Sequence, residues 1–464
     1  MIKTDIAIIG TGPGGYIAAL RARQLGARVV CIEKEHIGGV CLNEGCIPTK
    51  ALLRSAEVLQ LAREADRYGV RVGEVDFDWA AVQARKARVV SQLVGGVAKL
   101  LSRAGVQVLS GTARLARERT LMVESAAGNE AVEAETIVIA TGSRPLIVPV
   151  PGLDDPEILD STTALALERL PHSLCIIGSG AIGTEFASLF ATLGVQVTLV
   201  EMLPRVAPLM DESVSEGLAW SLGQRGVAIK TGARVTQVEH LAEGYRTTLQ
   251  TREGTQVVES ERVMSAIGRA PNVEGLGLET IGLVPTRKGI QVDTHMRTAA
   301  PGVYAIGDVA AEGPMLAHVA SRQGIVAVED ALGLPARMDY AVVPSCIYSL
   351  PEAAGVGLTE EQARAQYGQV LTGKFALANN GKAVAMGDTD GMVKVIAEAQ
   401  HGAVLGVHVI GPHASDLVLQ GALGIQLELT LAEWAQTIQP HPSLGEALSE
   451  AVLAALGSPL AVPG

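Results

Sequence analysis

Apolar and polar positions follow the same order in two separate parts of the chain. Residues 5–33 contain an apolar run, a glycine-rich turn, an amphipathic stretch and a β-branched run. Residues 176–201 repeat this order. A strand, a helix and a second strand in this order are typical of a βαβ unit in a parallel sheet. The sequence therefore predicts an α/β fold in which this unit is used twice.

Each repeat carries a Gly-x-Gly-x-x-Gly segment, formed by Gly10, Gly12 and Gly15 in the first copy and by Gly178, Gly180 and Gly183 in the second. The first glycine allows a tight turn, the second lets the backbone approach a pyrophosphate, and the third lets the helix pack on the strand. One such segment alone is often an ordinary glycine turn, but two copies with matching strands and helices disfavour that alternative. Two Rossmann-like dinucleotide-binding domains are therefore expected.

An acidic residue follows the first glycine by 23 positions in both copies, as Glu33 and Glu201. A carboxylate at the end of the second strand accepts a hydrogen bond from a ribose 2′-hydroxyl. A 2′-phosphate would be repelled there, so we expect the second unit to bind NAD rather than NADP.

Composition and charge narrow the class of protein. The 464 residues exceed one ordinary domain, and 48% hydrophobic with 19% charged residues indicates large buried cores. The net charge of -12, without a long basic run, disfavours a nucleic acid partner. No apolar run is long enough to span a membrane, and a strand begins almost at the first residue, so we expect a soluble, cytoplasmic protein without a signal peptide.

Cys41 and Cys46 are the main candidates for redox chemistry. In a reducing compartment, a close cysteine pair is more often catalytic or metal-binding than structural. Further Cys or His at ligand spacing do not occur nearby, so no metal is expected. A regular helix would hold the two thiols too far apart for a disulfide, so Gly45 is expected to distort the turn and Pro48 to limit its continuation. Two buried structural thiols remain the alternative.

Charged residues elsewhere are candidates for supporting roles. Lys50 is a cation that favours a nearby thiolate, and Glu185 is an acid in a segment of small and apolar residues. An ion pair between them is a hypothesis, with exposed surface charges as the alternative. His441 lies between two prolines, and a carboxylate from Glu446 would orient it as a base for a dithiol. A loop histidine that caps a helix is the alternative.

Turns at the ends of other predicted strands add candidates for nucleotide contacts, namely Thr141 with Gly142, Gly268, and Asp308. Asp308 follows Gly307 at the end of a predicted strand, and a long helical stretch starts after it at about Met315. A turn or helix-capping aspartate is the alternative interpretation of Asp308.

Together, the motifs resemble those of the flavoprotein disulfide reductases, the pyridine nucleotide-disulfide oxidoreductases, along nearly the whole chain. The resemblance rests on both glycine segments and on residues 38–50, 304–308, 315–318 and 441–446. It implies FAD on the first glycine segment and NAD on the second. Within the family, the chain is most similar to the members that oxidise protein-bound dihydrolipoamide with NAD+.

The resemblance also implies a role for each candidate residue. Cys46 would face the flavin, Cys41 would exchange with the substrate, and His441 would act as the acid and base in the site of the other subunit of a homodimer. Lys50 would favour charge on the reduced flavin, and Asp308 would bind the ribityl chain. The start of a helix would stabilise the same charge through Met315, Leu316, Ala317 and His318.

Four parts are expected: an FAD domain (1–149), an NAD domain (150–270), a central segment that completes the FAD site (271–340) and an α+β dimerisation domain (341–464). The implied partners are the lipoyl domains and acyltransferase core of 2-oxo acid dehydrogenase complexes, or the glycine cleavage system. A flavin transhydrogenase of the same fold and a non-catalytic flavoprotein are the rivals. Both are disfavoured because Cys41, Cys46 and His441 are all present.

Overall fold

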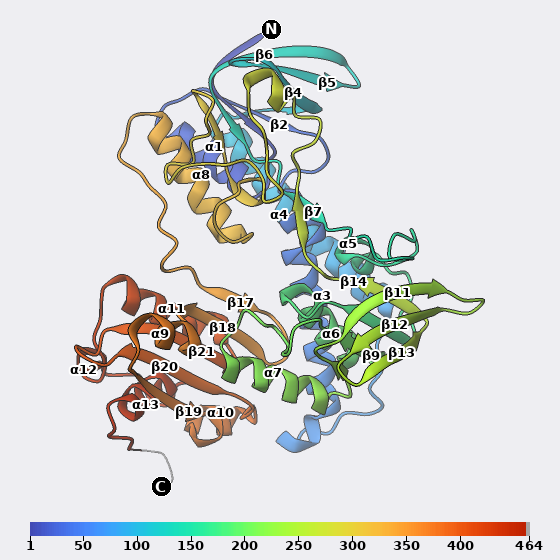
Figure 1. Ribbon diagram of the computed structural model, residues 1–464, viewed down its shortest axis with the longest axis vertical. Helices are drawn as coiled ribbons and strands as arrows, with labels where there is room; N and C mark the ends of the chain where they lie inside the picture. Colours follow the sequence, from blue (N-terminus) through green and yellow to red (C-terminus); the bar gives the residue numbers. More distant parts are fainter. Residues whose placement is uncertain (461–464) are drawn as a thin grey trace. The chain divides into compact units, whose positions relative to one another are not determined.

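The computed structural model describes residues 1–460, and in it the chain forms two compact units that each combine distant segments (Figure 1). The first unit consists of Met1–Ala51, Ala80–Leu146 and Gly268–Tyr340. The second consists of Leu52–Trp79, Ile147–Ile267 and the chain from Ala341 onward. The predicted four-part division at residues 149, 270 and 340 stays a prediction. No helix in residues 1–460 is long and apolar enough to cross a membrane.

The first unit is built on a seven-stranded sheet. In sheet order its strands are β3 (Gln107–Ser110), β2 (Val29–Glu33), β1 (Ile2–Ile9), β6 (Gly128–Ile139), β5 (Thr120–Ser125) and β4 (Thr112–Arg117), with β16 (Val303–Ala305) also paired to β6. The strands β3, β2, β1, β6 and β16 are parallel, and β4 to β6 form an antiparallel meander. The predicted first βαβ unit is therefore present.

Helices α1 (Pro13–Gln24) and α8 (Ala317–Ala331) pack against each other in this unit (Figure 1). A side chain at Gly324 would come within 2.5 Å of the Gly14 carbonyl oxygen, so small residues allow the close approach. The unit also contains α2 (Gly39–Glu44), most of α4 (Trp79–Arg103), the short pair β7 (Ser143–Pro145) and β15 (Arg269–Pro271), and the 3-10 turns η2 (Leu278–Ile281) and η3 (Gly307–Val309). Helix α3 (Cys46–Arg63) begins in the first unit and ends in the second.

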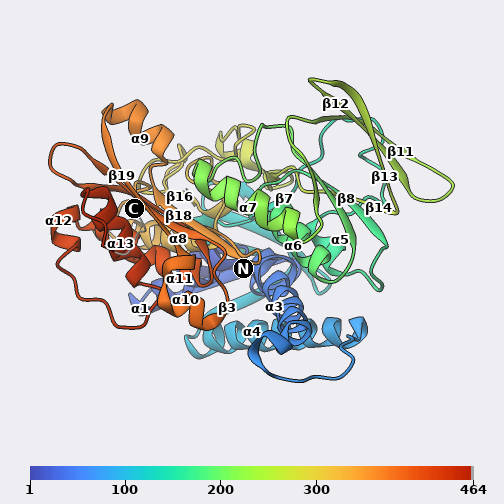
Figure 2. The ribbon, with the colours of Figure 1, turned by 90° about the horizontal axis from the view of Figure 1, so that it is seen from below.

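The second unit contains the repeated βαβ unit as a parallel sheet. Its strands, in order, are β10 (Ala228–Lys230), β9 (Gln196–Val200), β8 (Ser173–Ile177) and β14 (Arg262–Ser265). The helices beside it are α5 (Ser161–Leu165), α6 (Ala181–Thr192) and α7 (Glu212–Gln224). The unit also has a twisted antiparallel ribbon, formed by β11 (Arg234–His240), β12 (Tyr245–Thr251) and β13 (Gly254–Ser260) (Figures 1 and 2).

The C-terminal part of the second unit is an antiparallel sheet with helices. The strands, in order, are β17 (Ser345–Ile347), β18 (Glu352–Gly357), β21 (Val404–Gly411), β20 (Met392–Glu398) and β19 (Val370–Ala376). The helices are α9 (Glu360–Tyr367), α10 (Gly381–Met386), α11 (Ala414–Gln426), α12 (Leu431–Trp434) and α13 (Glu446–Ala455). The remaining short turns of this unit are η1 (Ala65–Tyr68) and η4 (Leu377–Asn379).

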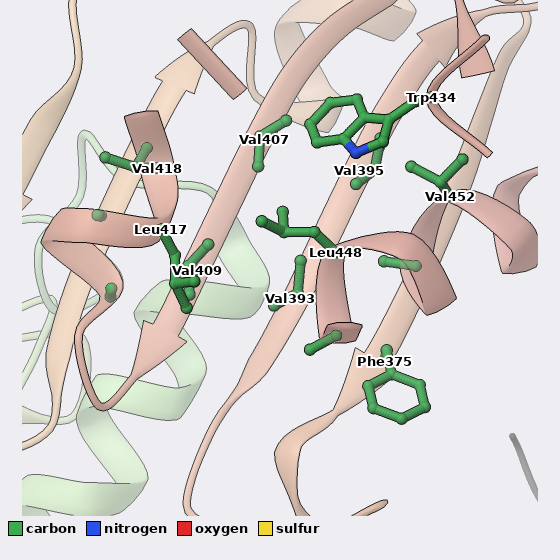
Figure 3. Close-up of a cluster of buried hydrophobic side chains, with 14 of the residues drawn as sticks. Phe375, Val393, Val395, Val407, Val409, Leu417, Val418, Trp434, Leu448 and Val452 are labelled. Atoms are coloured by element: carbon green, nitrogen blue, oxygen red, sulfur yellow. The ribbon is translucent and has the colours of Figure 1, made fainter. Parts of the chain in front are cut away.

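Figure 3 shows how this sheet is held to its helices. Alternate valines of β20 and β21 point to one face, because successive strand side chains alternate between faces. These valines pack with Leu417 and Val418 of α11, with Trp434, and with Leu448 and Val452 of α13. The predicted α/β architecture with a C-terminal α+β domain is confirmed.

Candidate active site

The first glycine segment forms a cradle at the N-terminus of α1. Gly10 has a φ of +97°, and a side chain there would overlap the carbonyl oxygen of Ala140. At Gly12, by contrast, no heavy atom among the described residues lies within 4 Å of the position a Cβ would take. The backbone at Gly12 is therefore open to a bound group at a helix N-terminus, which fits the pyrophosphate of a dinucleotide.

The second glycine segment repeats this geometry at the N-terminus of α6. Gly178 has a φ of +99°, and its Cβ would come within 2.5 Å of the Ala266 carbonyl oxygen. At Gly180, as at Gly12, no heavy atom of the described residues lies within 4 Å of the position that a Cβ would take. The two cradles therefore match at the positions where the sequence predicts nucleotide binding.

The two strand-end acids are also held alike. The Glu33 Oε2 accepts hydrogen bonds from the N–H of Thr11 at 2.8 Å and from its hydroxyl at 2.7 Å. The Glu201 Oε2 accepts from the N–H and hydroxyl of Ser179, both at 2.8 Å, and its Oε1 accepts from the Leu203 N–H at 2.8 Å. Each carboxylate is thus fixed at the rim of its cradle, and carboxylate oxygens have further lone pairs for a ribose hydroxyl.

Asp308 lies in a hydrogen-bonded cluster that the sequence did not reveal. Its Oδ2 accepts from the Ser143 hydroxyl at 2.5 Å, and Arg269 donates to the same hydroxyl at 2.7 Å and to the Ser143 carbonyl at 2.7 Å. Asp308 sits in η3, nine residues before α8 begins at Ala317, so it does not cap that helix. The pairing of β7 with β15, in which Ser143 lies opposite Pro271, brings Arg269 close enough to reach Ser143.

The turns around this cluster contain the other predicted strand-end residues. Thr141 donates its hydroxyl to the Asn272 carbonyl at 2.8 Å, and the Asn272 N–H donates to the Gly142 carbonyl at 2.9 Å. Gly142 and Gly268 both have positive φ, +69° and +132°. These residues therefore shape the link between β7 and β15; their contact with a nucleotide stays a prediction.

The N-terminus of helix α8 coincides with residues 315–318, which the resemblance assigns to the flavin site. Leu316 is the N-cap, with Met315 before it and Ala317 and His318 in the first turn. Within residues 1–460 no side chain caps this end by a hydrogen bond. The N-terminus of a 15-residue helix favours negative charge. Gln323, in the same helix, was not identified from the sequence, and its Oε1 accepts from the N–H of Gly307 at 2.6 Å.

The chain breaks its helix between the two candidate thiols. Helix α2 ends at Glu44, Gly45 adopts φ -146° and ψ -109°, and α3 starts at Cys46. This confirms the distortion expected at Gly45. The expectation that Pro48 limits the continuation is wrong, because Pro48 lies in the first turn of α3, where a missing N–H costs no helical hydrogen bond.

Cys41 and Cys46 are both half-buried in the structure. The side-chain hydrogen bond with Cys46, followed by burial and the charge of Cys46, raises the pKa of Cys41, and Lys50 opposes this shift. The two thiols therefore titrate as a coupled pair rather than independently. Burial raises the pKa of Tyr16 in α1, and an electrostatic interaction with Cys41 adds to this shift.

Lys50 lies in the first turns of α3, and Glu185 is buried in α6 of the second unit. The Glu185 Oε1 accepts a hydrogen bond from the Tyr348 N–H at 3.0 Å. Glu185 is therefore not an exposed surface charge. Its ion pair with Lys50 stays a prediction.

His441 and Glu446 form the predicted pair. The His441 Nδ1 lies 2.9 Å from the Glu446 Oε1, and the Glu446 Oε2 accepts from the Ser443 N–H at 2.8 Å. These two contacts, the Ser443 bond first, hold the pKa of Glu446 below its usual range. The His441 side chain is 79% exposed in the isolated chain. Gly445 is the N-cap of α13, so His441 does not cap that helix.

The comparisons with known proteins agree with this geometry. Residues 4–324 match the pyridine nucleotide-disulphide oxidoreductase family, and residues 343–452 match its dimerisation domain. The chain belongs to this family of flavin-dependent disulfide oxidoreductases.

Its relatives in the family are similar over almost their whole length. A dihydrolipoyl dehydrogenase of Bacillus subtilis is 43% identical over 454 residues, which cover 97% of this chain and 98% of that protein. One from Geobacillus stearothermophilus is 39% identical and covers 99% and 97%. The crystal structure of LpdA from Mycobacterium tuberculosis superimposes with a TM-score of 0.89 at 31% identity, covering 97% of this chain and 99% of LpdA.

Proposed function

We infer that this chain is a dihydrolipoyl dehydrogenase, which oxidises dihydrolipoamide to lipoamide with NAD+ and contains FAD. The observation that carries this conclusion is a 43% identity to a dihydrolipoyl dehydrogenase across nearly the whole chain, combined with a complete set of candidate residues. Two matched cradles, a close thiol pair and an oriented histidine all occur in one polypeptide.

The cradles fit the two cofactors that the family uses. Open backbone at Gly12 and Gly180 leaves room for two pyrophosphates, and Glu33 and Glu201 would bind the ribose hydroxyls. Asp308 and the N-terminus of α8 would hold the flavin part of FAD. When bound, FAD supplies the two-electron transfer between the thiol pair and NAD+.

The thiol pair accepts electrons from the substrate by disulfide exchange. A thiolate of dihydrolipoamide attacks the Cys41 sulfur of the Cys41–Cys46 disulfide, and Cys46 leaves as a thiolate. The second substrate sulfur then attacks the substrate sulfur of this mixed disulfide, which releases lipoamide and the Cys41 thiol. The direction of the Cys41 shift supports this division, because the hydrogen bond with Cys46 raises the pKa of Cys41 and so disfavours charge on it.

His441 is the proposed base that takes the proton from the substrate thiol. Glu446 holds its Nδ1, which leaves Nε2 to face the dithiol. His441 lies in the part of the chain that matches the dimerisation domain, and the protein is a homodimer. We propose that each His441 acts at the disulfide of the other subunit.

In a protein-bound substrate, the dithiol is carried by a partner protein. We propose that lipoyl domains of a 2-oxo acid dehydrogenase complex, or of the glycine cleavage system, deliver the substrate in the cytoplasm. Five cysteines without a disulfide scaffold fit such a reducing compartment. A pulldown that recovers the acyltransferase core from native extract supports this partner, whereas recovery of glycine cleavage components selects the other system.

Purified protein tests the function directly. Protein containing FAD should reduce NAD+ with dihydrolipoamide, and Cys41→Ser should remove this activity. Cys175→Ala is the matched control, because Cys175 is buried in the core of the parallel sheet of the second unit. A wild-type protein that reduces no NAD+ with dihydrolipoamide would refute the assignment.

A further inference from the structure

Lys394 is a charged residue buried in the middle of a β-sheet, outside the site described above. It lies in β20, and its side chain is 2% exposed. Its Nζ donates to both carboxylate oxygens of Asp211, at 2.7 and 2.9 Å, and lies 2.8 Å from the Glu360 Oε2. Burying an ammonium group is costly unless it is paired, so these two acids are its required partners.

Asp211 connects Lys394 to the nucleotide-binding part of the same unit. It is the N-cap of α7, where its Oδ1 accepts from the Ser213 N–H at 3.0 Å, and its Oδ2 accepts from the Glu360 N–H at 3.0 Å. Asp211 therefore joins α7, the start of α9 and β20. Burial alone would raise its pKa, but the hydrogen bonds from Lys394 and the Glu360 N–H lower it.

Asp211 follows Glu201, the acid at the rim of the second cradle, by ten positions. We call residues 202–210 the rim segment. Its middle is tied to the cradle, because the Ala207 N–H donates to the Ser179 carbonyl at 3.0 Å. Its end is tied to Ala207 by the Met210 N–H, at 2.9 Å. Ser179 is also the residue that holds Glu201, so the rim segment and the acid share one anchor.

The rim segment is held in an uncommon conformation. Ala207 has a φ of +45°, a region that residues with a side chain rarely adopt and that persists only where the surroundings enforce it. Val206 and Ala207 are buried, whereas Met202 is 61% and Leu209 93% exposed. One side of the segment is thus packed and the other side lines the surface beside Glu201.

We propose that Lys394, through Asp211, fixes the rim segment against Ser179 and Glu201, and so acts as a positioning residue for the binding of NAD. Without Lys394 the Asp211 carboxylate would be buried and unpaired, and it would move or take up a proton. Either change releases the end of the rim segment and lets Ala207 relax. This inference rests on the proposed function only in that NAD is the nucleotide of the second cradle.

Lys394→Met in the FAD-containing protein tests the proposal, because methionine keeps the length of the side chain and removes its charge. The dissociation constant for NAD+, which does not react with the oxidised flavin, should rise by about 5- to 50-fold when measured by calorimetry, within the usual range for coupling between sites. The KM for NAD+ should rise with it, while the KM for dihydrolipoamide should change by less than about 2-fold, because the rim segment contains none of the residues assigned to the dithiol reaction. Hydrogen exchange at the Ala207 and Met210 amides should become faster.

Val395→Ala is the matched control, because Val395 is the next residue of β20 and packs in the hydrophobic core instead. It should lower the melting temperature without changing the NAD+ dissociation constant. If Lys394→Met does not fold, the double variant Asp211→Asn with Lys394→Met leaves no buried unpaired charge and provides the same comparison.

Unchanged NAD+ binding and unchanged amide exchange at Ala207 in these variants would show that Lys394 only stabilises the fold. A wild-type protein that binds no NAD+ would also overturn the inference. Calorimetry needs no dithiol, so a chain that binds NAD+ but does not oxidise dihydrolipoamide would refute the proposed function and leave this inference standing.

Discussion

The two nucleotide cradles are nearly the same in geometry but differ in the segment that leads away from the acid at the strand end. Glu33 and Glu201 receive equivalent hydrogen bonds from Thr11 and Ser179. After Glu33 the chain enters a short turn, where the Glu35 N–H donates to Glu33 at 3.0 Å, and reaches Cys41 in α2. After Glu201 it runs through the rim segment to Asp211 and Lys394.

Because of this difference, we expect both copies to bind a nucleotide but only the first to take part in the dithiol reaction. The glycines and acids of both copies provide the same recognition of a pyrophosphate and a ribose. The first copy is followed by a thiol pair, 8 and 13 residues after its acid, whereas the second continues into a segment anchored by a buried lysine. Changes to the first copy should therefore affect the dithiol chemistry, and changes to the second should affect the choice and affinity of NAD.

The largest effect is expected at the thiols of the first copy. Cys46→Ser should lower NAD+ reduction by dihydrolipoamide by at least about 10³-fold, because the pair acts as a unit. Reduced wild-type protein should show a long-wavelength absorption band from the Cys46 thiolate beside the flavin. Cys41→Ser should keep such a band and Cys46→Ser should lose it. Equal bands in the two variants would contradict the assignment of the charge to Cys46.

His441→Gln should reduce the dithiol reaction by about 10²- to 10⁴-fold, the usual range for general acid–base catalysis. Flavin reduction by NADH, followed by stopped-flow absorbance, should change little because it needs no such base. Glu446→Gln should cost less, since the imidazole remains. Only a modest loss of stability, without a kinetic effect, would indicate a structural histidine.

Mixed dimers test whether His441 acts across the interface. His441→Gln and Cys41→Ser subunits should each be nearly inactive as homodimers. After subunit exchange, one site of the mixed dimer carries both defects and the other carries neither, so activity should return. No recovery in demonstrated mixed dimers would place both residues in the site of one subunit.

The cradles were predictable from sequence because their signal is local. A turn, a helix start and an acid at fixed spacing are required by the backbone geometry itself, as the positive φ of Gly10 and Gly178 shows. The break at Gly45 was predictable for the same reason. The prediction at Pro48 was wrong because the harm done by proline depends on its position in the helix, which the sequence alone did not define.

The links between distant segments were not predictable. Arg269 and Ser143 are 126 positions apart, and Lys394 and Asp211 are 183 positions apart, so no spacing rule connects them. A lysine between apolar residues in a strand pattern was the one local sign of a buried ion pair. Its partner could be found only from the three-dimensional structure.

A moderate effect is expected at the acid of the second copy. The ratio kcat/KM should favour NAD+ over NADP+ by at least about 10-fold, because Glu201 binds the 2′-hydroxyl and repels a 2′-phosphate. Glu201→Ala should narrow this ratio. Glu33→Ala is the matched control from the first copy, and it should weaken FAD retention without altering the ratio. Equal narrowing by both variants would remove the functional difference between the cradles.

The smallest effect concerns the stability of the sheet that carries Lys394. His408 lies opposite Lys394 in β21, is 3% exposed, and its Nε2 lies 2.9 Å from the Leu358 carbonyl oxygen. Burial lowers the pKa of His408, and the Asp211 charge opposes this while Lys394 adds to it. The folded protein therefore holds His408 neutral at a pH where the unfolded chain is already protonated.

Stability from His408 is present above its unfolded pKa of about 6.5 and is lost as the pH falls from there through the lowered folded pKa, by about 1.4 kcal/mol for each unit of difference. The pKa values of Asp211 and Glu360 are lowered despite burial. Their contribution to the free energy of unfolding is therefore lost only below about pH 4. Urea unfolding between pH 8 and 5 should therefore show a decline that His408→Gln removes, since glutamine can still donate to Leu358. His413→Gln, at a side chain that is 62% exposed, should leave the decline in place. A decline that persists in His408→Gln would assign it to other groups.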